Sequence, residues 1–167
     1  MGRGTAIFVI HTIPPVYNSR SRVLMLGSFP SPKSREAGFF YGHPQNRFWK
    51  VVSGALGQEC PLSIEEKRTF LLKNGIAVWD VLYSCDIDGA KDTSISNPVP
   101  NNLEVILSRA DIKGIFATGG KAYELYCRLC EPVTGIKAVK LPSTSPANAA
   151  FSEARLIEAY SVILEYL

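Results

Sequence analysis

The chain has 167 residues, of which 46% are hydrophobic and 20% charged, as is typical of a globular protein with its own core. Lys and Arg outnumber Asp and Glu by only 18 to 15, which gives a net charge of +3. The chain is therefore not basic throughout, and any surface that binds nucleic acid must be a local patch. We expect one domain over residues 1–167, acting as a monomer.

The amino-terminal segment predicts neither export nor lipid attachment. Its apolar stretch, ending at Ile10, is too short for a signal peptide and lacks a small-residue cleavage site. Gly2 would suit myristoylation, but Ala6 stands where Ser or Thr is expected. No apolar run approaches the roughly 18 residues that a membrane span needs. We therefore expect a cytoplasmic protein without membrane contact.

The first half of the chain predicts two strands with two helices between them. A strand over residues 22–27 follows a turn-rich segment. A long loop then leads to a helix over residues 47–57. A second helix, over residues 63–75, opens with a capping box at Ser63. The second strand covers residues 76–82.

The second half continues the alternation after a polar segment. Residues 83–100 are rich in turn formers, so we expect a loop there. The later elements are a helix over 101–109, a strand over 113–118, a helix over 120–130, a strand over 136–141 and a last helix that runs to about residue 164.

Strands and helices that alternate in this way predict an α/β fold with a parallel sheet. We expect three layers, α/β/α, around a central four-stranded parallel sheet. Ligands in such folds bind outside the carboxyl ends of the strands. The loops that follow residues 27, 82 and 141 leave the sheet at that edge, so we expect them to form one site.

The most distinctive segment covers residues 39–50. A hydrophobic core has no use for a histidine, an amide and an arginine at such density between aromatic residues. A pocket that stacks a flat ring, orients a water molecule and contacts a phosphate would need this mixture. The segment reads Phe-Phe-Tyr-Gly-His-Pro-Gln-Asn-Arg-Phe-Trp-Lys.

Three segments carry a resemblance to the uracil-DNA glycosylase superfamily. Residues 38–50 resemble the corresponding segment of mismatch-specific uracil-DNA glycosylases. The turn Gly27-Ser-Phe-Pro-Ser31 stands where those enzymes have a Gly-x-Asn-Pro-Gly motif. Leu141-Pro-Ser-Thr-Ser-Pro-Ala-Asn148 stands where the superfamily has its second motif, which enters the minor groove. This combination is most similar to the hypoxanthine-DNA (deoxyinosine) glycosylase branch, over about residues 11–165.

The resemblance implies a monofunctional enzyme of base excision repair, whose partner is DNA that contains deaminated bases. Such an enzyme flips the base out of the duplex, hydrolyses its N-glycosidic bond and leaves an abasic site. Hypoxanthine is the expected base, with uracil or xanthine as further substrates. The scheme requires no metal and no organic cofactor, and no lysine stands where a Schiff-base nucleophile is expected.

One residue departs from the superfamily pattern. Phe29 replaces the usual Asp or Asn that handles the attacking water, and a phenyl ring cannot orient water. The resemblance implies that Asn46 takes over this task. Because the sugar becomes a strong, oxocarbenium-like electrophile as the base departs, a neutral amide can suffice if it accepts from the water and fixes its direction.

The remaining site residues follow from the resemblance and from side-chain chemistry. We expect His43 to donate to the departing base or to a phosphate, and Tyr41 to stack on the flipped ring. The expected substrate-binding residues are Gly27, Ser28, Phe29, Pro30, Ser31, Tyr41 and Asp80. The expected DNA-binding residues are Arg47, Ser143, Thr144, Ser145 and Asn148, of which the three hydroxyl side chains suit phosphate oxygens.

Each of several residues also has a structural interpretation. Asn46 suits the N-cap of the helix that follows it. Tyr41 could belong to the core, and His43 could fix its own loop. Arg47 could form a surface ion pair, and Asp80 could be purely structural.

The polar segment and the cysteines leave further alternatives. Asp92 is a candidate for a base or backbone contact. Cys127 and Cys130 form a C-x-x-C pattern, which occurs in redox and metal sites. Both lie in an expected helix, and Cys60 and Cys85 form no second pair, so we expect structural cysteines.

Two other functions compete with the glycosylase. The Phe29 replacement would also fit a protein that binds DNA lesions without catalysis. A small-molecule hydrolase could use Ser28 or Ser31 with His43, but the chain lacks a Gly-x-Ser-x-Gly elbow.

Overall fold

A four-stranded parallel sheet forms the centre of the structure, a computed structural model that describes residues 5–167. Its strand order is β3-β2-β6-β7, and every neighbouring pair is parallel. The strands are β2 (Val23–Gly27), β3 (Ile76–Asp80), β6 (Gly114–Thr118) and β7 (Ala138–Leu141). All residues of β2 and β3 are buried, as expected for parallel strands that are covered on both faces.

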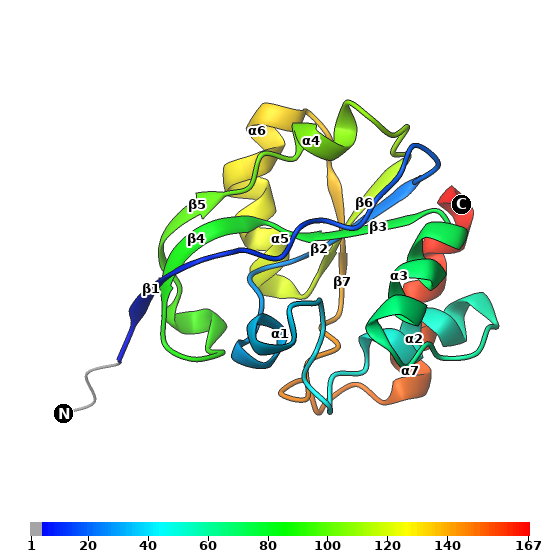
Figure 1. The fold of residues 1–167 in the computed structure, drawn as a ribbon, viewed down its shortest axis with the longest axis horizontal. Helices are drawn as coiled ribbons and strands as arrows, with labels where there is room; N and C mark the ends of the chain where they lie inside the picture. Colours follow the sequence, from blue (N-terminus) through cyan, green and yellow to red (C-terminus); the bar gives the residue numbers. More distant parts are fainter. Residues whose placement is uncertain (1–4) are drawn as a thin grey trace.

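Helices cover both faces of this sheet. In Figure 1, α2 (Phe48–Leu56), α3 (Ile64–Lys73) and α7 (Glu153–Tyr160) lie on one side of the strands. The other side carries α5 (Gly120–Leu125), a π-helical turn (Tyr126–Cys130) and α6 (Glu131–Thr134). The predicted three-layer arrangement with four parallel strands is confirmed. The shorter helical elements are α1 (Pro32–Ala37), α4 (Glu104–Leu107) and 3₁₀ turns at Asp92–Ser94 and Ser161–Tyr166.

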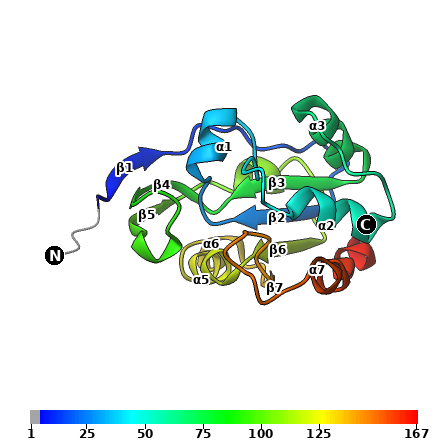
Figure 2. The same ribbon diagram turned by 90° about the horizontal axis from the view of Figure 1, so that it is seen from below.

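A second, antiparallel sheet was not predicted. It consists of β1 (Ile7–Ile10), β4 (Leu82–Ile87) and β5 (Ser96–Pro100), in the order β1-β4-β5. Figure 2 shows it beside the parallel sheet, and Val81 alone separates β3 from β4. The prediction of a loop over residues 83–100 is therefore wrong, because both ends of this segment form strands and only the part between β4 and β5 is a turn.

The error has a physical cause. The segment contains turn-forming residues, namely Asp86, Asp88 and Gly89, and these favoured the prediction of a loop. Its apolar residues Cys85 and Ile87 are nevertheless buried in the core. The prolines of β5 argue against an interior strand, but β5 pairs only with β4 and so lies at an edge, where proline is tolerated.

The long loop before residue 47 also contains an unpredicted helix. In α1, Ser31 accepts a hydrogen bond from the Ser34 N–H as the N-cap, and Pro32 follows at the first helical position. Gly38 then ends the helix in a left-handed conformation with φ of 72°. The helix is too short to show apolar periodicity, so the hydrophobic pattern could not reveal it.

Two expectations concern the amino-terminal end. The apolar residues before His11 form β1, which pairs with β4. Gly2, the residue considered for myristoylation, lies outside the described residues. Among the helices of residues 5–167, none combines the length and the apolar character that a membrane crossing requires.

Candidate active site

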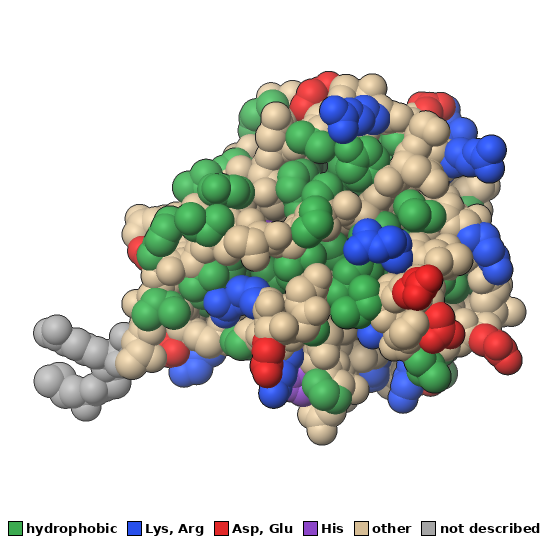
Figure 3. Space-filling model, in the orientation of Figure 1, with side chains coloured by type: hydrophobic (Ala, Val, Ile, Leu, Met, Phe, Trp, Pro, Cys, Tyr) green, Lys and Arg blue, Asp and Glu red, His purple; other side chains and the backbone are tan. Residues whose placement is uncertain are grey.

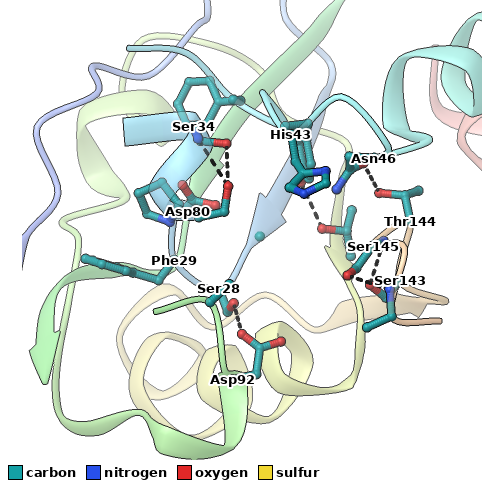
Figure 4. A pocket seen from close by; sticks show the side chains of 18 of the residues that line it. Ser28, Phe29, Ser34, His43, Asn46, Asp80, Asp92, Ser143, Thr144 and Ser145 are labelled. Atoms are coloured by element: carbon teal, nitrogen blue, oxygen red, sulfur yellow. Dashed lines mark hydrogen bonds between the residues drawn. The ribbon is translucent and has the colours of Figure 1, made fainter. Parts of the chain in front are cut away.

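A cavity of about 320 Å³ opens at the carboxyl edge of the parallel sheet (Figure 4). Its walls include the ends of three strands, at Gly27 of β2, Asp80 of β3 and Thr118 of β6. The segment after β7 adds Ser143 to Ala147. The segments after β2 and β7 therefore meet, as predicted from their position at this edge.

Most of the predicted site residues line this cavity. They are Gly27, Ser28, Phe29, Pro30, Ser31, Tyr41, His43, Asn46, Asp80, Ser143, Thr144 and Ser145. Arg47 and Asn148 are not among the residues that line the cavity. Asp92, the uncertain candidate, also lines the cavity. No site role was predicted for the remaining lining residues, which include Ser34, Phe40, Thr118 and Ala147.

The Asn46 carboxamide is held by its oxygen. Asn46 Oδ1 accepts from the Phe48 N–H at 2.9 Å and from the Thr144 hydroxyl at 2.8 Å. The first bond satisfies the N–H of Phe48, the first residue of α2, although the N-cap of this helix is Arg47 and not Asn46 as expected. Asn46 thus supports the start of α2 and also lines the cavity. A carbonyl oxygen has two lone pairs, and both are occupied here. The amide nitrogen forms no hydrogen bond to residues 5–167, and Figure 4 shows it on the side away from Thr144.

This geometry corrects two expectations. Asn46 was expected to accept a hydrogen bond from the water, but its oxygen already holds two donors. Thr144 was expected to bind a phosphate. Its side chain is instead turned inward, only 2% of the residue is exposed, and the hydroxyl donates to Asn46.

Arg47 connects the start of α2 to the segment between β7 and α7. Its guanidinium donates to the carbonyls of Asn148 at 2.9 Å and Phe151 at 2.6 Å, and its backbone N–H donates to the Thr144 carbonyl. The Asn148 side chain donates to the Ser143 carbonyl. In the described chain, Arg47 therefore forms internal hydrogen bonds where we expected a phosphate contact or an ion pair.

Tyr41 belongs both to the core and to the cavity wall. Its ring stacks on Phe48 with centroids 3.8 Å apart and an interplanar angle of 7°. Its hydroxyl lies 2.9 Å from Thr118 Oγ1. Burial, and next the Asp80 carboxylate, raise the pKa of Tyr41 well above its usual value, so the side chain is a neutral phenol.

Asp80 is a buried carboxylate at the bottom of the site, and 4% of the residue is exposed. Its Oδ2 lies 2.8 Å from Nε2 of His11. The Ile13 N–H donates to Nδ1 of the same ring, which assigns the ring proton to Nε2. The Nε2–H of His11 therefore donates to Oδ2 of Asp80.

The second carboxylate oxygen of Asp80 explains why residue 27 is a glycine. A Cβ atom on Gly27 would lie 2.5 Å from Asp80 Oδ1, so only glycine leaves room for this carboxylate. Phe29 packs edge-on against the His11 ring, with centroids 6.0 Å apart. The residue that departs from the superfamily pattern thus supports the partner of Asp80.

A second carboxylate reaches the cavity from the β4–β5 connection. Asp92 Oδ1 accepts from the Ser28 hydroxyl at 3.0 Å. Burial raises the pKa of Asp92, and the bond from Ser28 opposes this shift. The sequence offered Asp92 as an uncertain candidate, and the antiparallel sheet is what brings it to Ser28.

The opposite wall carries neutral polar groups. The Gln45 N–H donates to Nδ1 of His43, which fixes the loop and assigns the ring proton to Nε2. The interpretation that His43 fixes its own loop is thus confirmed. The Nε2–H of its ring is not used in this bond and can donate to another group. Ser143 Oγ accepts from the Ser145 N–H within its own turn.

Charges on the surface fit the modest net charge of +3. On the face shown in Figure 3, Lys and Arg side chains are scattered among apolar and acidic ones.

No cysteine is among the residues that line the cavity. Cys85 and Cys130 are buried, which raises the pKa of each thiol to about 11.

The family model for the uracil DNA glycosylase superfamily matches residues 14–166. The chain belongs to this superfamily. It is therefore a DNA glycosylase, a hydrolase of N-glycosyl bonds in DNA, as predicted.

Relatives and a solved structure agree with this assignment. A hypoxanthine DNA glycosylase of Methanosarcina acetivorans is 30% identical over 143 residues, which cover 85% of this chain and 90% of that protein. A hypoxanthine DNA glycosylase of Methanosarcina barkeri is 29% identical over 140 residues, covering 81% and 85%. The solution NMR structure of a candidate uracil DNA glycosylase from M. acetivorans is 28% identical, with a TM-score of 0.75 and coverage of 95% and 99%.

Proposed function

We propose that this DNA glycosylase removes hypoxanthine from deoxyinosine in DNA, with uracil and xanthine as further substrates, and leaves an abasic site. The observation that carries the proposal is Asp80, a buried carboxylate that lines the cavity beside Gly27. The names of the two Methanosarcina relatives support the same base.

Asp80 suits the edge that deaminated bases share. Hypoxanthine and uracil both present a ring N–H next to a carbonyl, and a carboxylate oxygen accepts from that N–H. Adenine has a lone pair at the equivalent ring nitrogen, which a carboxylate repels. Leaving a buried polar group unpaired costs about 1–3 kcal/mol, which is enough to discriminate between the bases.

The aromatic part of the site suits a flipped base. Tyr41 is fixed by Phe48 behind it and by Thr118 at its hydroxyl, so the ring cannot turn away. Stacking of a base on such a ring contributes about 1–3 kcal/mol. We expect backbone N–H groups of the turn over residues 28–31, which lines the cavity, to stabilise negative charge that grows on the departing base.

The neutral wall suits the sugar and its phosphates. The free amide nitrogen of Asn46 donates to a water molecule and holds it near the sugar carbon, while one lone pair of the water remains for attack. Position matters more than basicity for so electrophilic a carbon. His43 donates through Nε2 to the departing base or a flanking phosphate, and Ser143 and Ser145 remain candidates for phosphate contacts.

Further expectations accompany this proposal. We expect a single-domain enzyme that acts as a monomer. Every group in the scheme is a protein side chain or backbone amide, so the reaction needs neither a metal nor a cofactor. The expected location is cytoplasmic, and nucleoid-associated if the source is prokaryotic.

The hydrolase alternative loses its support. The Ser28 hydroxyl donates to Asp92, and the Ser31 hydroxyl caps α1 and donates to Ser34. Within the described residues, neither hydroxyl is hydrogen bonded to His43, so the site lacks the pairing of nucleophile and base that this alternative needs.

The test is base release from a panel of duplexes. Duplexes containing hypoxanthine, uracil, xanthine or a thymine mismatch, and an undamaged duplex, are incubated with excess protein and then treated with alkali to cleave abasic sites. We expect the fastest cleavage for hypoxanthine, none for the undamaged duplex, and none without alkali. Faster release of uracil than of hypoxanthine would contradict the base assignment. No cleavage above the protein-free control would contradict the proposed activity altogether.

A further inference from the structure

We infer that Thr144 is a positioning residue, whose hydroxyl fixes the Asn46 carboxamide so that its nitrogen faces the cavity. This inference rests on the proposed function, because it requires Asn46 to hold the reacting water. It assigns a role in catalysis to a residue of the segment that is expected to enter the minor groove.

The hydrogen bonds of Asn46 show why a second donor matters. The Phe48 N–H bond alone would leave the amide plane free to turn about that bond. The Thr144 hydroxyl reaches the same oxygen from a different segment, 98 residues further along the chain. Two donors from two directions fix the plane, and the amide nitrogen is then held toward the cavity.

Thr144 is itself held in place without DNA. The Arg47 N–H donates to its carbonyl at 3.1 Å, and the Arg47 guanidinium holds the following residues through two further carbonyls. The Tyr160 hydroxyl donates to the Pro142 carbonyl at 2.6 Å. Elements before and after the segment thus anchor it, and it presents the Thr144 hydroxyl to Asn46 in the free protein.

The arrangement joins two parts of the site that act on different parts of the substrate. The segment around Thr144 lies where DNA is expected to bind, and Asn46 lies where the water is expected to sit. A displacement of the segment would break the hydrogen bond from Thr144 to Asn46 and leave the amide free to rotate. Catalysis therefore requires the segment to stay in the position seen here. A phosphate contact by Thr144 would instead affect DNA affinity, and the two roles therefore predict different measurements.

The experiment compares Thr144→Val, which keeps the shape and removes the hydroxyl, with Thr144→Ser, which keeps the hydroxyl. Two quantities are measured: the single-turnover rate of hypoxanthine release with enzyme in excess, and the dissociation constant for a duplex carrying a stable abasic-site analogue. For Thr144→Val we expect a rate about ten-fold lower, as for loss of one hydrogen bond that orients a reactive group, and a dissociation constant within about two-fold of the wild type. Thr144→Ser should restore most of the rate.

Controls separate this role from a loss of folding. Thr69→Val, on the exposed surface of α3, makes the same chemical change far from the cavity and should leave the rate unchanged. If Thr144→Val does not fold, as judged by its thermal transition, Thr144→Ala provides the same comparison. A wild-type rate in the folded variant would overturn the inference. So would a weakened affinity with an unchanged rate at saturation, because that is the result expected of a phosphate contact.

A double substitution tests whether Thr144 acts through Asn46. With Asn46→Ala already in place, removing the Thr144 hydroxyl should change the remaining rate by less than about two-fold. A ten-fold loss in both backgrounds would overturn the inference. If the wild type releases no hypoxanthine but does release uracil, the base assignment fails, and the same comparison is made with uracil.

Discussion

The two walls of the cavity differ in charge. On one side stand the carboxylates of Asp80 and Asp92, which accept hydrogen bonds from His11 and Ser28 respectively. The other side carries the amide of Asn46, the imidazole of His43 and serine hydroxyls, and among its lining residues none is acidic. We refer to these as the acidic wall and the neutral wall.

This difference suggests a division of tasks. Carboxylates accept from ring N–H groups, so the acidic wall suits the edge of a base. They also repel phosphates, so a wall that faces the DNA backbone is better built from amide and hydroxyl groups. The predictions below test whether each wall acts as its charge suggests.

The largest effect is expected for the neutral wall, at Asn46. Asn46→Ala removes the amide nitrogen that holds the water and should lower the single-turnover rate by at least about 100-fold, in the range for loss of a positioned catalytic group. The affinity for DNA should change little, since the acidic wall and the stacking ring remain. Rapid-quench measurement of base release checks the rate. Asn102→Ala, at the start of α4, serves as the matched control, and full activity of Asn46→Ala would remove the assigned role.

On the acidic wall, Asp80→Asn should change the base preference more than the chemistry. The His11 Nε2–H and the base N–H both need an acceptor, and an amide supplies only one oxygen. With its oxygen on His11, the new amide presents N–H groups to the base and opposes hypoxanthine. We expect about 10- to 100-fold slower release of hypoxanthine, corresponding to roughly 1–3 kcal/mol.

The measurement is competition between duplexes that contain hypoxanthine and duplexes with adenine at the same position. Binding of the adenine duplex should weaken less in the variant than binding of the hypoxanthine duplex, because adenine accepts at the ring nitrogen. An equal loss for both duplexes would indicate that Asp80 is structural and does not read the base.

The two walls also differ in how well the sequence predicted them. The neutral wall comes from two continuous segments, residues 39–50 and 141–148, whose unusual composition marks them directly. The acidic wall depends on pairing between distant residues. His11 lies 69 positions from Asp80, and its role follows only from the path that brings it there. A single histidine next to a short apolar stretch gives no signal of that contact.

The same contrast holds for the two sheets. The parallel strands were predicted because both of their faces are buried and each is a run of apolar residues. In β4, Tyr83 is exposed and Asp86 is half buried, so the apolar run is broken. Asp92 was accordingly seen as a loop residue, although the turn between β4 and β5 holds it against Ser28.

The smallest effect concerns Asp92 and the pH dependence of stability. Burial raises the pKa of Asp92 above its ordinary value of 3.8, so the folded protein binds this proton more tightly than the unfolded chain does. Stability is therefore lost as pH rises through the ordinary value toward the raised one, and the ionised form remains a small cost at neutral pH. Asp92→Asn keeps an acceptor for Ser28 without the charge, and should slightly raise the melting temperature at pH 7.

This difference should vanish as the pH falls below 3.8, where both folded and unfolded forms carry the proton. Melting curves of the two proteins across pH 3 to 8 make the comparison. Asn46→Ala, a change in the neutral wall, should shift the melting temperature by the same amount at every pH. A stability difference for Asp92→Asn that does not depend on pH would show that its carboxylate is not desolvated beside Ser28, and the acidic wall would then consist of Asp80 alone.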